Sequence, residues 1–132
     1  MSTSERSSEY NVKLEPVGFV RSNPPGGPAE VVIYEEFSEA LDGIEGCGHI
    51  WVLFWMHRQG DRRRLKVHPM GDRNRPEQGV FSLRSPVRPN PIGLTRVRLL
   101  RREGNVLVVQ GLDALEGSPV LDIKPWIKGT DG

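Results

Sequence analysis

The chain has 132 residues with a formal net charge of +1, and 36% of them are hydrophobic. This length fits a single domain that buries roughly two thirds of its unfolded surface, and 15 glycines with 11 prolines indicate many turns. The single cysteine excludes an internal disulfide framework, and no stretch approaches the ~20 apolar residues of a membrane span. We therefore expect a cytoplasmic protein without a membrane anchor.

The N-terminal third predicts a leader, a strand, a loop and a short helix. Residues 1–10 lack an apolar signal core, and we expect them to form a disordered leader before a folded domain at 11–132. Residues 13–22 read as a first strand, and the prolines and glycines of 23–28 read as a loop. Residues 35–44 predict a short helix, because one helical face would collect Phe37, Ala40, Leu41 and Ile44.

The strongest predicted strand covers residues 49–57. Ile50, Val52, Phe54 and Met56 alternate with a second set that begins and ends on histidine, His49 and His57. Because both sets are largely apolar, we expect both faces to be covered and the strand to be central.

Residues 58–78 show no periodicity and predict a mobile basic loop. Further strands follow: Thr95, Val97 and Leu99 alternate with Arg96, Arg98 and Leu100, a turn at 103–105 leads into 106–112, and 119–123 is the last strand. Many short strands with one short helix and long loops predict an all-β fold, a single β-barrel.

The segment RSPVRPNPIGL, residues 84–94, holds three prolines at Pro86, Pro89 and Pro91. Each proline fixes its own φ and removes a backbone donor, so the segment is a stiff loop and not a helix or a central strand. It displays two guanidiniums, a hydroxyl and an amide, and Gly93 then lets the chain turn into an apolar strand. A rigid loop with polar tips indicates a preorganised ligand site, whereas a solvated surface crossover is the alternative.

Charge is distributed unevenly along the chain. Residues 58–102 contain thirteen Lys or Arg against three acidic residues, a local balance of +10, while 1–57 carry −6 and 103–132 carry −3. A basic middle segment indicates a surface that faces a polyanion, although solvated loop arginines are the simpler interpretation.

Neither GxGxxG nor GxxxxGK[ST] occurs, which argues against nicotinamide and P-loop sites. Cys47, His49, His57 and His68 match no tetrahedral zinc spacing, so we predict no metal site.

Four segments together resemble the TrmO/YaeB (TsaA-like) family of S-adenosylmethionine-dependent tRNA methyltransferases. They are the proline-rich segment, the preceding GVFSL (79–83), LDGIEGCGHIWVLFWMH (41–57) and GLDALEGSPVLDIKPW (111–126). The chain departs from the family pattern at Trp126, where many members have Tyr. It also ends at Gly132, whereas longer bacterial members continue into a second domain.

The resemblance implies a β-barrel methyltransferase domain over 11–132, S-adenosyl-L-methionine as cofactor, and tRNA and a second copy of the chain as partners. The implied target is the base-attached nitrogen of threonylcarbamoyladenosine in the anticodon loop. Non-catalytic RNA binding, or methylation of another RNA or a small molecule, stays an alternative.

Candidate site residues follow from the motifs and from this resemblance. The predicted cofactor contacts are His57, Arg58, Arg84, Ser85, Arg88, Pro89, Asn90, Pro91, Ile92, Gly93, Leu94, Asp113, Ala114, Leu115 and Glu116. Either Arg84 or Arg88 could fork onto a carboxylate or phosphate, and Asp113 and Glu116 could bind ribose hydroxyls or an amine. The predicted RNA contacts are Arg62, Arg63, Arg64 and Lys124.

Two residues are candidates for a catalytic base. His57 ends the predicted central strand, and histidine is the residue type whose ordinary pKa lies near neutrality, which suits proton transfer. Asp122 belongs to the last motif. Each also has a structural interpretation: His57 as a strand-end residue, and Asp122 with Lys124 as a surface ion pair. Positioning of the reactants against a sulfonium, without a side-chain base, is the third interpretation.

Overall fold

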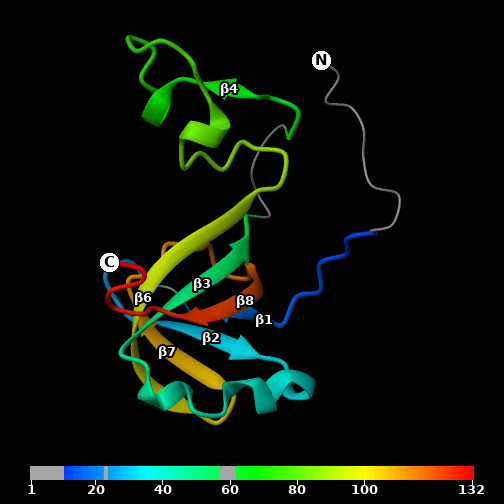
Figure 1. Ribbon diagram of the computed structural model, residues 1–132, viewed down its shortest axis with the longest axis vertical. Coiled ribbons are helices and arrows are strands. Elements are labelled where there is room, and N and C mark those ends of the chain that lie inside the picture. Colours follow the sequence, from blue (N-terminus) through cyan, green and yellow to red (C-terminus); the bar gives the residue numbers. More distant parts are fainter. Residues whose placement is uncertain (1–10, 23, 57–61) are drawn as a thin grey trace.

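The computed structural model describes residues 11–22, 24–56 and 62–132. Its centre is a closed barrel of antiparallel strands in the order β1-β2-β7-β6-β3-β8 (Figure 1). The strands are β1 (Gly18–Arg21), β2 (Ala29–Ile33), β3 (His49–Trp55), β6 (Ile92–Glu103), β7 (Val106–Gln110) and β8 (Pro119–Pro125). Strand β8 pairs with β1 and closes the ring, which confirms the all-β barrel predicted from the sequence.

The barrel interior is filled by alternate residues of these strands, as a two-residue period requires. Fully buried aliphatic side chains come from every barrel strand: Val20, Val31, Ile50, Val52, Val97, Leu107, Val109 and Val120. Leu41 and Leu112 extend this core at the barrel ends. Burying such side chains contributes roughly 1.5–3 kcal/mol each, so the core is the main source of stability.

Strand β3 is central because both of its edges are paired. It runs antiparallel to β6 from His49↔Arg98 to Trp55↔Ile92, and antiparallel to β8 from Ile50↔Pro125 onward. The expectation that both faces are covered was wrong. Only the Ile50, Val52 and Phe54 face is buried, whereas the outward residues are half-exposed on the barrel wall.

Other sequence predictions need adjustment. The chain from Glu35 to Leu41 forms a 3-10 helix, η1, followed by a second 3-10 turn, η2 (Ile44–Gly46), so the α-helical face does not form and Ala40 is exposed. Strand β2 was missed, although Ala29, Val31 and Ile33 alternate as an inward face. The predicted hairpin is confirmed, with Gly104 at φ 62° between β6 and β7.

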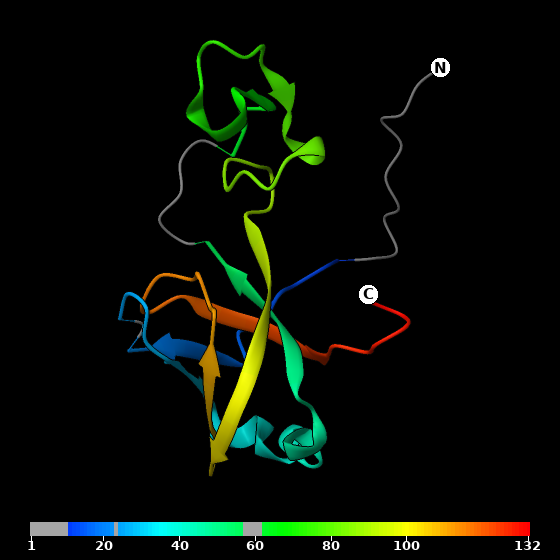
Figure 2. The same ribbon diagram turned by 90° about the vertical axis from the view of Figure 1, so that its left-hand side faces the viewer.

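Residues 62–83, which we call the arm, stand off one end of the barrel, while η1 and η2 lie at the other end (Figures 1 and 2). The sequence predicted a loop without regular structure here. The arm instead contains a two-stranded sheet, β4 (Lys66–Val67) with β5 (Gln78–Gly79), and the 3-10 turns η3 (Pro69–Gly71) and η4 (Val80–Ser82). No helix in the described part of the chain is long and apolar enough to cross a membrane.

Gly93 makes room for a core aromatic ring. The residue lies inside β6, opposite Phe54 of β3, and its interpretation as a turn was wrong. A Cβ on residue 93 would lie 2.3 Å from Cζ of Phe54, far inside contact distance. Phe54 is only 4% exposed and belongs to the core cluster, so a shift of its ring would disturb the packing around it.

We therefore expect Gly93→Ala to destabilise the fold by about 1–3 kcal/mol, the usual cost of overpacking a core. Urea unfolding monitored by circular dichroism measures the change. Gly48→Ala is the matched control, because a Cβ there meets nothing within 4 Å. Equal stability of the two variants would show that the Phe54 ring shifts without cost.

Candidate functional site

The proline loop, residues 84–91, is held by bonds within itself and to the barrel. The Ser85 hydroxyl accepts a bond from the Val87 N–H at 3.1 Å. The Arg88 guanidinium donates to the carbonyls of Leu83 at 3.0 Å and Ser85 at 2.9 Å. The Met56 N–H donates to the Pro91 carbonyl at 2.7 Å and ties the loop to the end of β3. The loop is therefore preorganised, as its prolines predicted.

A cavity of about 470 Å³ lies between this loop and the barrel. The loop contributes Arg84, Arg88 and Asn90, and β6 and the end of β3 contribute apolar walls. The lining residues are Phe54, Met56, Arg84, Arg88, Asn90, Ile92, Gly93, Leu94, Thr95 and Asp113. A concave site that combines apolar walls with convergent polar groups is the usual form of a small-molecule site.

Asp113 brings a distant motif to this cavity. It belongs to GLDALEG, and its carboxylate accepts a bond from the Thr95 hydroxyl on β6 at 2.5 Å. The two motifs singled out in the sequence therefore meet at one cavity. Phe54, Met56 and Thr95 were not among the predicted site residues, because their alternation reads as strand packing alone.

Arg84 and Arg88 have different environments. Arg88 is half-buried, and one nitrogen of its guanidinium donates hydrogen bonds to two loop carbonyls. Arg88 therefore braces the loop that it belongs to. Arg84 is exposed at the cavity, and no hydrogen bond or ion pair of its side chain is seen in the described residues. Arg84 is thus the guanidinium best placed to meet an anionic group.

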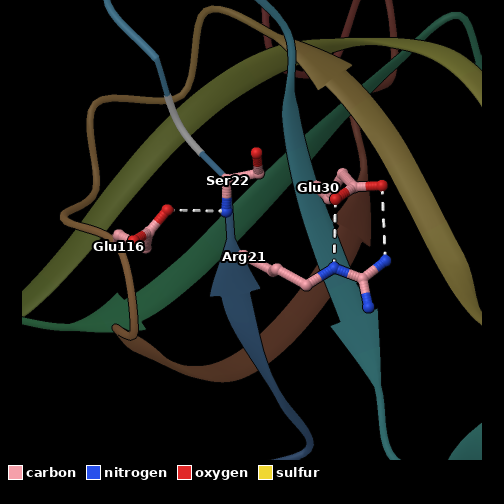
Figure 3. Close-up of polar contacts among 4 residues, drawn as sticks. All are labelled: Arg21, Ser22, Glu30 and Glu116. Carbon is pink, nitrogen blue, oxygen red and sulfur yellow. Dashed lines mark hydrogen bonds and ion pairs between the residues drawn. The ribbon is translucent and has the colours of Figure 1, made fainter.

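The rest of GLDALEG does not reach the cavity. Ala114 is 4% exposed and belongs to the core, whereas Leu115 is 47% exposed. The Glu116 carboxylate accepts a bond from the Ser22 N–H at 3.0 Å, which fixes the turn at the end of β1 (Figure 3).

An ion pair lies beside that turn. Figure 3 also shows Arg21 forked onto Glu30 across β1 and β2, with bonds of 3.0 and 3.3 Å. The bond from Arg21 holds the pKa of the Glu30 carboxyl below its usual value. This exposed pair and Glu116 therefore organise one end of the barrel and lie outside the cavity lining.

Arg62 and Arg64, from the run of three consecutive arginines, are engaged within the chain. Arg62 donates to the Pro89 carbonyl at 2.6 Å and lies over the Trp55 ring at 5.6 Å. Arg64 forms an ion pair with Glu77 at 3.3 Å. Arg62 thus braces the proline loop from outside, and phosphate binding by Arg62, Arg63 and Arg64 stays a prediction.

Asp122, one of the two predicted bases, does not line this cavity. His57 and Arg58 lie outside the described residues. Asp122 is half-exposed on β8, where it pairs with Lys124 at 3.3 Å and accepts a bond from the Ile123 N–H. Asp122 lines a different, apolar hollow of about 300 Å³ beside η1. A catalytic role for Asp122 or His57 stays a prediction.

Comparison with known proteins gives the family. Residues 22–132 match the family model described as the tRNA-methyltransferase O N-terminal domain. A probable S-adenosyl-L-methionine-binding protein of Methanothermobacter thermautotrophicus is 44% identical, over 94% of this chain and 96% of its own length. A tRNA (adenine(37)-N6)-methyltransferase of Mus musculus is 37% identical, over 92% of this chain and 32% of its own length.

A crystal structure of TrmO from Pseudomonas aeruginosa superposes with a TM-score of 0.73 at 31% identity. The match covers 92% of this chain and 58% of that protein, so the chain spans little more than half of its length. The family model, the sequence relatives and the structural match all indicate the same family. The chain belongs to the tRNA-methyltransferase O family.

Proposed function

We propose that this protein is an S-adenosylmethionine-dependent methyltransferase that acts on tRNA. One observation carries the proposal: the proline loop and Asp113, from the two family motifs, line one cavity of about 470 Å³. The names of the archaeal and mouse relatives supply the cofactor and the substrate class. A tRNA substrate is consistent with a cytoplasmic protein.

The cavity residues suit such a cofactor. The volume of the cavity lies within the roughly 300–1,000 Å³ that is usual for small-molecule sites. Phe54, Met56, Ile92 and Leu94 offer apolar surface for an adenine ring and a thioether chain. Arg84 offers a guanidinium to a carboxylate, and Asp113 keeps acceptor capacity for a hydroxyl or an amine, since one oxygen of its carboxylate takes the Thr95 bond.

When bound, the sulfonium of the cofactor supplies an activated methyl group, so the protein has mainly to bind and orient. Arg84 would neutralise the carboxylate, and Asp113 and Asn90 would fix the polar end. Arg88 and Arg62 act through the loop: by bonding its carbonyls they keep its geometry unchanged when a ligand enters. Because the loop loses its conformational entropy when the protein folds, it does not lose that entropy again when a ligand binds.

We further propose the adenine amino nitrogen of threonylcarbamoyladenosine in the anticodon loop as the target. The mouse relative is named for adenine N6 at position 37. This nitrogen lies between an aromatic ring and a carbonyl, so it is a weak nucleophile until its proton leaves. Asp122 does not line the cavity within one chain, so it is not placed there to take this proton. We favour orientation against the sulfonium, because transfer from a good leaving group asks little more of the protein than positioning.

We also propose that the active unit is a dimer. The arm carries large apolar side chains that its own barrel does not cover: Leu65 is 60% exposed, Phe81 81% and Met70 98%. A hollow of about 480 Å³ lies between the arm and the proline loop, next to Met70. Exposed apolar surface beside a ligand cavity suits an interface with a second copy.

The cofactor site is tested by Arg84→Ala. We expect adenosylmethionine affinity to fall roughly tenfold or more, because a charge-assisted bond is lost, with little change in stability. Arg88→Ala should weaken binding and also lower the melting temperature, since two loop carbonyls lose their donor. Calorimetric titration with Arg73→Ala, an exposed arm arginine, as control measures the difference. Unchanged affinity in Arg84→Ala would remove this residue from the site.

The reaction is tested by incubating the chain with labelled adenosylmethionine and tRNA from a strain that lacks the endogenous methyltransferase. We expect one methyl group on threonylcarbamoyladenosine, detected by nucleoside mass spectrometry. An unchanged single-turnover rate and pH profile in Asp122→Asn and His57→Ala would support positioning alone. Binding of cofactor and RNA without any transfer would instead indicate a non-catalytic RNA-binding protein.

The dimer is tested by Met70→Asp with Phe81→Ser. These changes place polar groups on the apolar arm surface, so we expect sedimentation to shift from dimer to monomer. The control is Arg73→Glu, which changes arm charge without changing apolar surface. A wild type that is monomeric and fully active at working concentration would defeat the proposal.

A further inference from the structure

Strands β6, β3 and β8 lie side by side and present one continuous outer surface (Figure 1). Their register aligns the outward side chains in rows across the three strands. Trp51 lies between Arg96 and Lys124, and the neighbouring row pairs His49 with Arg98. Just beyond β8, the Trp126 N–H bonds the His49 carbonyl at 3.1 Å. We call this surface the outer wall; its residues are His49, Trp51, Leu53, Leu94, Arg96, Arg98, Asp122, Lys124 and Trp126.

Among the residues that the structure describes, two arginines of the outer wall lack the ion pairs that four other surface arginines make. Arg21, Arg64, Arg101 and Arg102 each pair with a glutamate. Arg96 and Arg98 lie on the same strand as Arg101 and Arg102, yet no carboxylate of the described residues pairs with either. Lys124 has only the exposed Asp122, a kind of pair that contributes little. Arg96 and Arg98 therefore give the outer wall positive charge that no carboxylate of the described residues neutralises.

Aromatic rings lie among these cations. Arg96 is over the Trp126 ring at 5.0 Å, and the His49 ring meets the edge of Trp126 at 5.8 Å. Trp51 and Trp126 are both half-exposed. Arg96 covers part of the Trp126 indole, so a base would stack on Trp51 and on the part of the Trp126 ring left open. Half-exposed indoles beside cations match the chemistry of single-stranded nucleic acid, whose bases stack on aromatic rings while phosphates meet Arg and Lys.

The outer wall also borders the ligand cavity. Leu94, 41% exposed, faces outward opposite Leu53 and at the same time lines the cavity. Arg96 follows two residues later on the same face of β6. A strand of RNA on the wall would thus have a base at the mouth of the cavity.

We propose that the outer wall binds a single-stranded segment of the RNA substrate, with Trp51 and Trp126 as stacking surfaces and Arg96, Arg98 and Lys124 as phosphate contacts. This inference rests on the proposed function for its substrate class, and it adds a surface separate from the consecutive arginines of the arm. Double-stranded RNA fits less well, because its stacked bases offer no free faces to the indoles.

The test compares variants in RNA binding by fluorescence anisotropy, with a labelled oligoribonucleotide of about a dozen nucleotides and with intact tRNA. For Arg96→Gln with Arg98→Gln we expect affinity to fall roughly tenfold or more, and the slope of log K against log salt to flatten by about 1.4, since each phosphate contact contributes ~0.7. Trp126→Ala should weaken binding roughly tenfold with the salt slope unchanged.

The matched control is Arg21→Gln with Arg101→Gln, which removes the same charge from arginines already paired with glutamate. It should bind RNA within about twofold of the wild type, because distant exposed charges are screened. Equal losses in the wall and control variants would reduce the effect to net charge and overturn the proposal. So would wild-type binding in the wall variants, or a wall variant whose sedimentation shows that the wall is a contact between copies.

A methyl-transfer assay on tRNA, run beside the RNA-binding assay, separates this inference from the proposed function. Loss of RNA binding in the wall variants alongside a wild type that transfers no methyl group would support the wall and defeat the proposed reaction. Methyl transfer by the wall variants with an unchanged KM for tRNA would defeat the wall and leave the reaction standing.

Discussion

The antiparallel pairing of β3 on both of its edges is the constraint on which the rest of the structure depends. Through it, Ile50 and Val52 enter the core, and Phe54 enters opposite Gly93. The same pairing sets Trp51 between Arg96 and Lys124 on the outside. At the end of β3, the bond from the Met56 N–H to the Pro91 carbonyl fixes the proline loop against the barrel. A slip of one residue would exchange the two faces of the strand and disrupt core, cavity and wall together.

Arginines in this chain fall into groups that differ in what they contact. Some are paired with glutamates on the surface, and these pairs are exposed and contribute little to stability. Arg88 and Arg62 bond loop carbonyls and keep the cavity wall rigid. Arg84, Arg96 and Arg98 are at the cavity or on the wall, without a carboxylate partner in the described residues. Sequence counts of basic residues cannot separate these groups, since only the register decides which arginine meets which neighbour.

Much of the fold could be predicted because it follows from local patterns. Alternation over 49–57 gave the central strand, and Gly104 gave the hairpin, since both depend on near neighbours in sequence. The short helix predicted at 35–44 is present as the 3-10 helix Glu35–Leu41, but a second 3-10 turn follows at Ile44–Gly46, so the four apolar residues do not share one α-helical face. The arm sheet could not be predicted, because two-residue strands carry no period.

The sequence predicts which motifs form the site, but not which residues of those motifs reach the cavity. The motif around Arg84 and that around Asp113 do meet, yet the meeting is made by Thr95, a residue with no sequence signal of its own. Glu116 looked equivalent to Asp113 in the same turn, but its carboxylate accepts a bond from the Ser22 N–H and does not line the cavity. Leu94 links the cavity to the outer wall, because it faces outward on β6 and also lines the cavity. A bound cofactor and a bound RNA would therefore be neighbours on β6, the longest strand of the barrel, which begins directly after the proline loop.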